Sequence, residues 1–85
     1  MPPTGLCLSE NGRAFVTCSH SLGEVLVLDP LTSEILEILP AGHGANAPVY
    51  SPVRNILYVA NQYDDDISVI NLESGEEITR IDVLR

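Results

Sequence analysis

Three consecutive aspartates are the most chemically suggestive residues of this 85-residue chain. Asp64, Asp65 and Asp66 lie between two apolar runs in the stretch ILYVANQYDDDISVI. Carboxylate oxygens are hard ligands that suit calcium, so the triplet is a candidate metal site. A calcium ion takes about six to eight oxygens from alternating positions, and three successive side chains do not turn toward one ion without a special loop. The competing interpretation is a solvated loop whose charges discourage edge pairing.

His43 is the second candidate, because it lies between two glycines in the stretch AGHGANAP. Glycines in such positions indicate an unusual backbone or close approach to another group. A histidine there could ligate a metal or a haem, or hydrogen-bond to a carbonyl, which makes His43 a candidate cofactor-binding residue. No second ligand lies nearby at metal-binding spacing, so a structural or solvent-exposed histidine is the alternative. His20 has a weaker claim to either role.

The short motifs of several enzyme classes are absent from the sequence. It contains no Gly-rich phosphate loop, no serine-centred elbow and no HExxH. Cys7 and Cys18 form neither a CxxC pair nor a CxxCH haem-attachment motif. We therefore expect a protein that is not an enzyme, with no catalytic residue and no cofactor assigned.

The charge balance limits the partners that the chain can bind. Twelve acidic residues face four arginines and no lysine, which gives a net charge of −8. Nucleic acid and anionic membranes would repel such a surface, whereas cations or basic proteins would be attracted. No run of apolar residues is long enough for a transmembrane helix, so membrane insertion is not expected. The start MPPTGLCLSENG lacks the basic and apolar regions of a signal peptide.

Short apolar runs between turn signals recur at intervals of about ten residues, with no helical periodicity, and this pattern is typical of an all-β fold. The sequence predicts eight strands. They span 4–8, 14–19, 24–29, 34–39, 48–51, 56–60, 66–71 and 77–83.

The predicted turns support this assignment. Asn11-Gly12 is a strong signal for a type I′ hairpin. Pairing Leu8 with Ala14 around it would point the sulfurs of Cys7 and Cys18 to opposite faces, so we expect two free thiols. The stretches DPLTSE and NLESGEE each place an Asx residue at a strand end before polar turn residues and a glutamate, as two copies of one turn would.

The two halves of the chain align as a repeat of 42 to 43 residues. Phe15 aligns with Tyr58, Val27 with Val69, and Asp29 with Asn71. That interval and four strands per unit are typical of a propeller blade. The strands VLVL and ISVI are apolar on nearly every residue, as expected where blades stack and bury both sheet faces.

The second copy closely resembles the YVTN-type β-propeller repeat. Residues 57–61, LYVAN, match the first strand block of that repeat, and residues 67–71, ISVIN, match its second block. The first copy is more diverged, with AFVTC and VLVLD at these places. The resemblance implies two four-stranded antiparallel blades within one partial β-propeller domain, 1–85, with blade one at about 3–40 and blade two at about 45–85.

Two blades do not close a ring, so the resemblance implies a fragment or a protomer of a larger propeller. The expected function is a non-enzymatic repeat module that binds a protein or a cell-envelope component, with further blades or copies of itself as partners. The alternative is part of the propeller domain of a redox protein, of the c-type cytochrome, haem d1 or quinoprotein kind. Family members are mostly exported, which implies the periplasm or the cell surface.

Blade topology predicts where these candidates gather. The loops between second and third strands and the connections between blades emerge on one rim. His20, His43 and the three aspartates 64–66 are therefore expected on the same face of the molecule.

Overall fold

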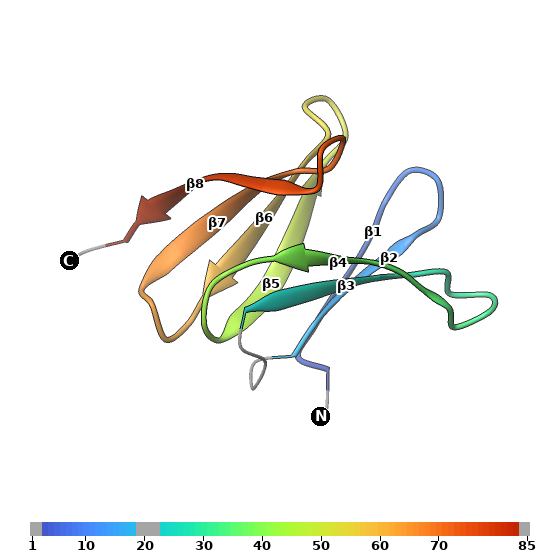
Figure 1. Ribbon diagram of the computed structural model, residues 1–85, viewed down its shortest axis with the longest axis horizontal. Helices are drawn as coiled ribbons and strands as arrows, with labels where there is room; N and C mark the ends of the chain where they lie inside the picture. Colours follow the sequence, from blue (N-terminus) through green and yellow to red (C-terminus); the bar gives the residue numbers. More distant parts are fainter. Residues whose placement is uncertain (1–2, 19–22, 84–85) are drawn as a thin grey trace.

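The computed structural model describes residues 3–18 and 23–83, and in them it shows eight β-strands and no helix (Figure 1). None of these residues forms a helix that could cross a membrane. The strands are β1 Gly5–Leu8, β2 Ala14–Thr17, β3 Glu24–Leu28, β4 Ile35–Pro40, β5 Ala45–Ser51, β6 Ile56–Asn61, β7 Asp66–Asn71 and β8 Glu76–Asp82.

The strands form two four-stranded antiparallel sheets, each with its strands in chain order. We call the β1–β4 sheet the first blade and the β5–β8 sheet the second blade. The predicted all-β class is confirmed, and the bounds of the eight strands lie within a few residues of the predicted bounds. The largest difference is β5, which begins at Ala45 and not at Pro48 because Ala45 and Asn46 already pair with β6. A bulge before Val49 separates this early pairing from the rest of the strand.

The turns of DPLTSE and NLESGEE are two copies of one structure, as predicted. The Asp29 side chain accepts a hydrogen bond from the Leu31 N–H at 2.9 Å, and the Asn71 side chain accepts the equivalent bond from Glu73 at 2.9 Å. Ser33 and Gly75 then adopt positive φ angles of 64° and 75°. The bulges that precede these turns, at 27/28 and 69/70, are also equivalent.

The prediction of a type I′ turn at Asn11-Gly12 is wrong. Of the two residues only Gly12 has a positive φ, and its N–H donates to the Ser9 carbonyl at 3.1 Å. The Ser9 N–H donates in turn to the Arg13 carbonyl at 2.9 Å, so the loop is longer than a two-residue turn. Asn55, at the equivalent place in the second blade, also has a positive φ, of 53°.

The predicted register of the first hairpin is confirmed. Leu8 pairs with Ala14, and Cys7 lies opposite Phe15. Cys7 and Cys18 are both free and half-buried.

The core lies between the two blades, where one face of each sheet packs against the other. From the first blade it contains Phe15, Val25, Val27 and Leu39, and from the second Ala45, Leu57, Val59 and Ile70. Phe15 also contacts the ring of Tyr50, with centroids 6.0 Å apart. Burial of these side chains from both halves of the chain holds the two blades together.

The opposite faces of both blades are largely apolar. Many of their side chains are open to solvent, although Ala14 and Val69 on these faces are only 4% and 7% exposed. On the first blade the exposed fractions are 67% for Leu6, 59% for Leu8 and 52% for Ile38. On the second blade Val49 is 59% exposed and Ile81 is 48% exposed. We call these surfaces the outer faces. A hollow of about 480 Å³ opens on the outer face of the first blade, between Leu6, Val16 and Leu28.

Candidate functional site

The connection between the blades and the β6–β7 loop lie together on one rim. The Tyr63 N–H donates to the His43 carbonyl at 3.2 Å, and the Ala41 N–H donates to the Gly23 carbonyl at 2.8 Å. The topology therefore brings His43 and the aspartate loop to one end of the molecule, as the sequence predicted, and Gly23 lies at the same end. His20 lies outside the described residues.

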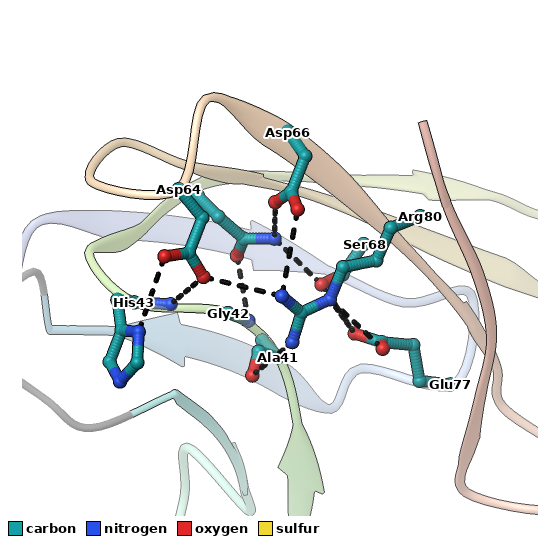
Figure 2. A network of polar contacts seen from close by, with 9 residues as sticks. Ala41, Gly42, His43, Asp64, Asp66, Ser68, Glu77 and Arg80 are labelled. Atoms are coloured by element: carbon teal, nitrogen blue, oxygen red, sulfur yellow. Dashed lines mark hydrogen bonds and ion pairs between the residues drawn. The ribbon is translucent and has the colours of Figure 1, made fainter. Parts of the chain in front are cut away.

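Asp64 holds His43 through two contacts (Figure 2). Its Oδ2 accepts a hydrogen bond from the His43 backbone N–H at 3.0 Å, and its Oδ1 lies 3.2 Å from His43 Nδ1. An ionised carboxylate only accepts hydrogen bonds, so this contact makes Nδ1 the donor. The His43 side chain is 62% exposed, and its Nε2 points away from the network in Figure 2.

Asn61 is hydrogen-bonded to the backbone of the connection between the two blades. It is only 2% exposed, and its Oδ1 accepts a hydrogen bond from the Gly42 N–H at 2.9 Å. Its Nδ2 donates to Asp66 Oδ1 at 2.7 Å and to Ser68 Oγ at 2.8 Å. All the hydrogen-bonding atoms of the Asn61 side chain are therefore used, which fixes the direction of the amide.

Arg80 joins the aspartate loop, strand β8 and the blade connection. Its Nη1 lies 3.2 Å from Asp64 Oδ2 and 3.5 Å from Asp66 Oδ2. Its Nε donates to Glu77 at 3.0 Å, and its Nη2 donates to the Ala41 carbonyl at 3.4 Å. One guanidinium thus contacts three carboxylates and the backbone of the connection, which suits its fixed fork of donors.

Ser68 links the buried and exposed parts of this network. It is fully buried and donates to Glu77 Oε2 at 2.6 Å. Among the described residues, every buried side-chain nitrogen and oxygen has a hydrogen-bond partner. We call Asn61, Asp64, Asp66, Ser68, Glu77 and Arg80 the rim clamp, because together they hold the backbone of residues 41–43.

The rim clamp shifts two ionisation equilibria. The His43 backbone N–H lowers the pKa of Asp64, desolvation opposes this effect, and the His43 side chain and Arg80 add to the lowering. For Arg80, desolvation acts to lower the pKa, but the carboxylates of Glu77, Asp66 and Asp64 outweigh it and raise the pKa. Both shifts favour the charged forms, so the ion pairs persist at neutral pH.

The glycines on either side of His43 are explained by packing. A Cβ at Gly42 would lie 2.5 Å from Asn61 Cγ and 2.8 Å from Asp64 Oδ2. Gly44 has a φ of 72°, and a Cβ there would lie 2.7 Å from the Tyr63 ring. The close approach that the sequence suggested is therefore an approach to the aspartate loop of the second blade.

The three aspartates do not act as one group. Asp64 and Asp66 converge on Arg80, whereas Asp65 is exposed and has a φ of 54°. Within residues 3–18 and 23–83, no group of three or more His, Cys, Asp or Glu side chains is placed to hold a metal ion. Sequence reasoning found Asp64, Asp66 and His43 but missed Asn61, Ser68, Glu77 and Arg80. The available signal was Asn61 and Ser68, which are polar residues at inward positions of the mainly apolar strands β6 and β7.

A cavity of about 280 Å³ lies near the opposite rim, between the blades. Phe15, Val27, Tyr50 and Leu72 contribute apolar surface to it, and Arg13 and Glu37 contribute charged groups. None of the residues predicted as sites lies in this cavity.

Comparison with known proteins supports the fold. No family model matches the sequence, and no curated protein matches it. Among solved structures, the chain is similar to a chain of Kuenenia stuttgartiensis hydrazine synthase, with a TM-score of 0.84 and 26% sequence identity. The match covers 95% of this chain and 23% of that chain, so this chain spans less than a quarter of the length of its neighbour. This likeness supports the fold described above, in which the two four-stranded antiparallel sheets are propeller blades.

Proposed function

We propose that this chain is a non-enzymatic β-propeller module that binds protein through the outer faces of its two blades. The observation that carries the proposal is the pair of apolar outer faces on a two-blade stack. Exposed apolar patches of this kind mark surfaces that bind partners. The partners are further propeller blades, which would cover the outer faces as the blades of this chain cover each other.

The rim clamp supports a structural and not a catalytic role for the conspicuous polar residues. Asp64, Asp66 and Arg80 are occupied with one another and with the backbone of the blade connection. A general acid or a nucleophile needs a free reactive atom directed at a substrate position. We therefore assign these residues to holding adjacent blades together, in a YVTN-type repeat of an exported or cell-surface protein.

Site-specific photocrosslinking in cells tests this proposal. A photoreactive amino acid is placed at Leu6 and at Ile81, one on each outer face, and at Val53 as a control in a turn. Val53 is 95% exposed, so the control position is fully accessible. We expect protein adducts from positions 6 and 81 and few from position 53. Equal adduct yields at all three positions would contradict the proposal.

A second candidate function is part of the propeller domain of a redox protein. Its support is the likeness to hydrazine synthase together with the hydrogen bonding and exposure of the His43 ring. In the neutral imidazole, donation from Nδ1 to Asp64 leaves the lone pair of the exposed Nε2 free. This is the tautomer that a histidine needs in order to bind a metal through Nε2. A haem or a metal bound there would draw its other ligands from outside the described residues.

Titration with ferric haem tests the second candidate. The purified chain and a His43→Ala variant are compared by the position and intensity of the Soret band. Ligation by His43 predicts a shifted band for the wild type that the variant loses, and a smaller shift for Asp64→Asn. Identical spectra for wild type and His43→Ala would rule out His43 as a haem ligand.

A further inference from the structure

We infer that the outer face of the second blade docks onto the outer face of the first blade of another copy of this chain, in a head-to-tail arrangement. This inference rests on the proposed function, because it names the partner of the same outer faces. It follows from comparing each face with its equivalent in the other repeat.

The outer face of the second blade is the repeat equivalent of the face of the first blade that packs against the second blade. Within the molecule, the first blade presents Phe15, Val25, Val27 and Leu39 to the second blade. The strand registers make Tyr58, Ile67, Val69 and Ile81 their equivalents, since Tyr58 pairs with Val69 as Phe15 pairs with Val27, and Ile81 pairs with Ile67 as Leu39 pairs with Val25. All four equivalents are apolar or aromatic, and they lie on the outer face of the second blade.

The outer face of the first blade is the repeat equivalent of the face of the second blade that packs against the first blade. The second blade presents Tyr50, Leu57, Val59 and Ile70 to the first. Their equivalents by register are Leu8, Ala14, Val16 and Leu28. The two outer faces are therefore counterparts of the two surfaces that already pack together inside the molecule. Neither set of equivalent positions contains a charged residue, so these positions bring no like charges directly into contact.

The rim clamp has no polar counterpart on the outer face of the first blade. In the second blade, Ser68, Glu77 and Arg80 belong to the clamp that holds the connection arriving from the first blade. The residues at these places in the first blade are Leu26, Ile35 and Ile38. The second blade therefore holds its neighbour, the first blade, partly through polar side chains. At the equivalent positions on its outer face, the first blade has apolar side chains. Apolar contact alone suits a blade supplied by another molecule.

The geometry is heterologous, because two different faces meet. Contacts of this kind continue from copy to copy until a ring closes. Blocking either face should therefore stop the association, while two molecules blocked on different faces should still form one contact with each other.

Sedimentation of two charge variants tests this arrangement. Leu8→Glu blocks the first blade and Ile81→Glu blocks the second; both side chains are about half exposed, so a charge there is solvated in the monomer. Val53→Glu is the matched control in an exposed turn. Leu6→Glu replaces Leu8→Glu if circular dichroism shows that the latter unfolds.

We expect wild type and Val53→Glu to associate, each face variant alone to be monomeric, and an equimolar mixture of the two face variants to form a one-to-one dimer. Association of either face variant with itself would show that like faces pair, and would overturn the head-to-tail arrangement. A folded, monomeric wild type that is captured by a different protein through the same faces would overturn this inference and leave the proposed function intact. A monomer whose outer faces bind neither would overturn both.

Discussion

Phe15 and Tyr58 occupy the same position in two repeats, yet Phe15 is buried between the blades and Tyr58 lies on an outer face. Phe15 pairs with Val27, and Tyr58 pairs with Val69, so their settings within each sheet are the same. The difference arises from what lies beyond each sheet. The two repeats form equivalent faces. In a stack of two blades, the face of the first blade that contains Phe15 is buried against the second blade, whereas the equivalent face of the second blade, which contains Tyr58, has no blade against it.

This relationship predicts unequal costs for the same kind of substitution. We expect Phe15→Leu to lower the free energy of unfolding by about 1 to 3 kcal/mol, the range for a disturbed core. Tyr58→Leu in the monomer should change it by no more than about 0.5 kcal/mol. Urea denaturation at low protein concentration measures both. Equal losses would show that Phe15 is not buried between blades.

Arg80→Gln should destabilise the protein by about 1 kcal/mol, because its ion pairs are partly exposed and therefore weak individually. The variant removes the contacts to Asp64, Asp66 and the Ala41 carbonyl together. Arg54→Gln, in an exposed turn, is the matched control and should have little effect. The comparison is made by thermal and urea denaturation. Arg80→Gln and Arg54→Gln with the same midpoint would contradict a clamping role.

Asp64 should contribute to stability at neutral pH and lose that contribution in acid. Its pKa in the folded state lies below the ordinary value of 3.8, so the stabilisation is complete above that value and disappears as the pH falls through the folded pKa. Asp64→Asn should therefore flatten the loss of stability below about pH 4. Asp65→Asn, at an exposed position of the same loop, is the matched control. The profile is measured from urea midpoints, and similar profiles for both variants would count against the interpretation.

Ser33→Gly should stabilise the protein. Ser33 has a φ of 64° at the turn position where the second blade has Gly75. Relieving a left-handed conformation gains roughly 1 to 2 kcal/mol, and the extra freedom of glycine in the unfolded chain offsets about half of this. A net gain of about 0.5 kcal/mol in thermal denaturation is expected. A loss of stability would show that the serine side chain has another role in the turn.

The repeat made much of the fold predictable from the sequence. The strands, the equivalent turns after Asp29 and Asn71, and the meeting of His43 with the aspartate loop all follow from local patterns and blade topology. The turn at Asn11-Gly12 was mispredicted because the Ser9 N–H and carbonyl close a longer loop.

The rim clamp was not predictable in the same way. Arg80 reaches the carbonyl of Ala41, 39 residues earlier in the chain, and this contact depends on how the blades pack. Sequence patterns report local periodicity and do not report which long side chain crosses between sheets. Ser68, a polar residue in the mainly apolar strand β7, was the sequence feature that indicated the clamp.

The most direct test of the central claim, that the outer faces bind other blades, is light scattering of the wild-type chain over a wide concentration range, with an apolar fluorescent dye measured in parallel. The account predicts a mass that rises from 9.2 kDa to a discrete multiple of it, with dye binding that falls as the multiple forms. A folded chain that stays at 9.2 kDa at every concentration and never binds the dye would contradict the account.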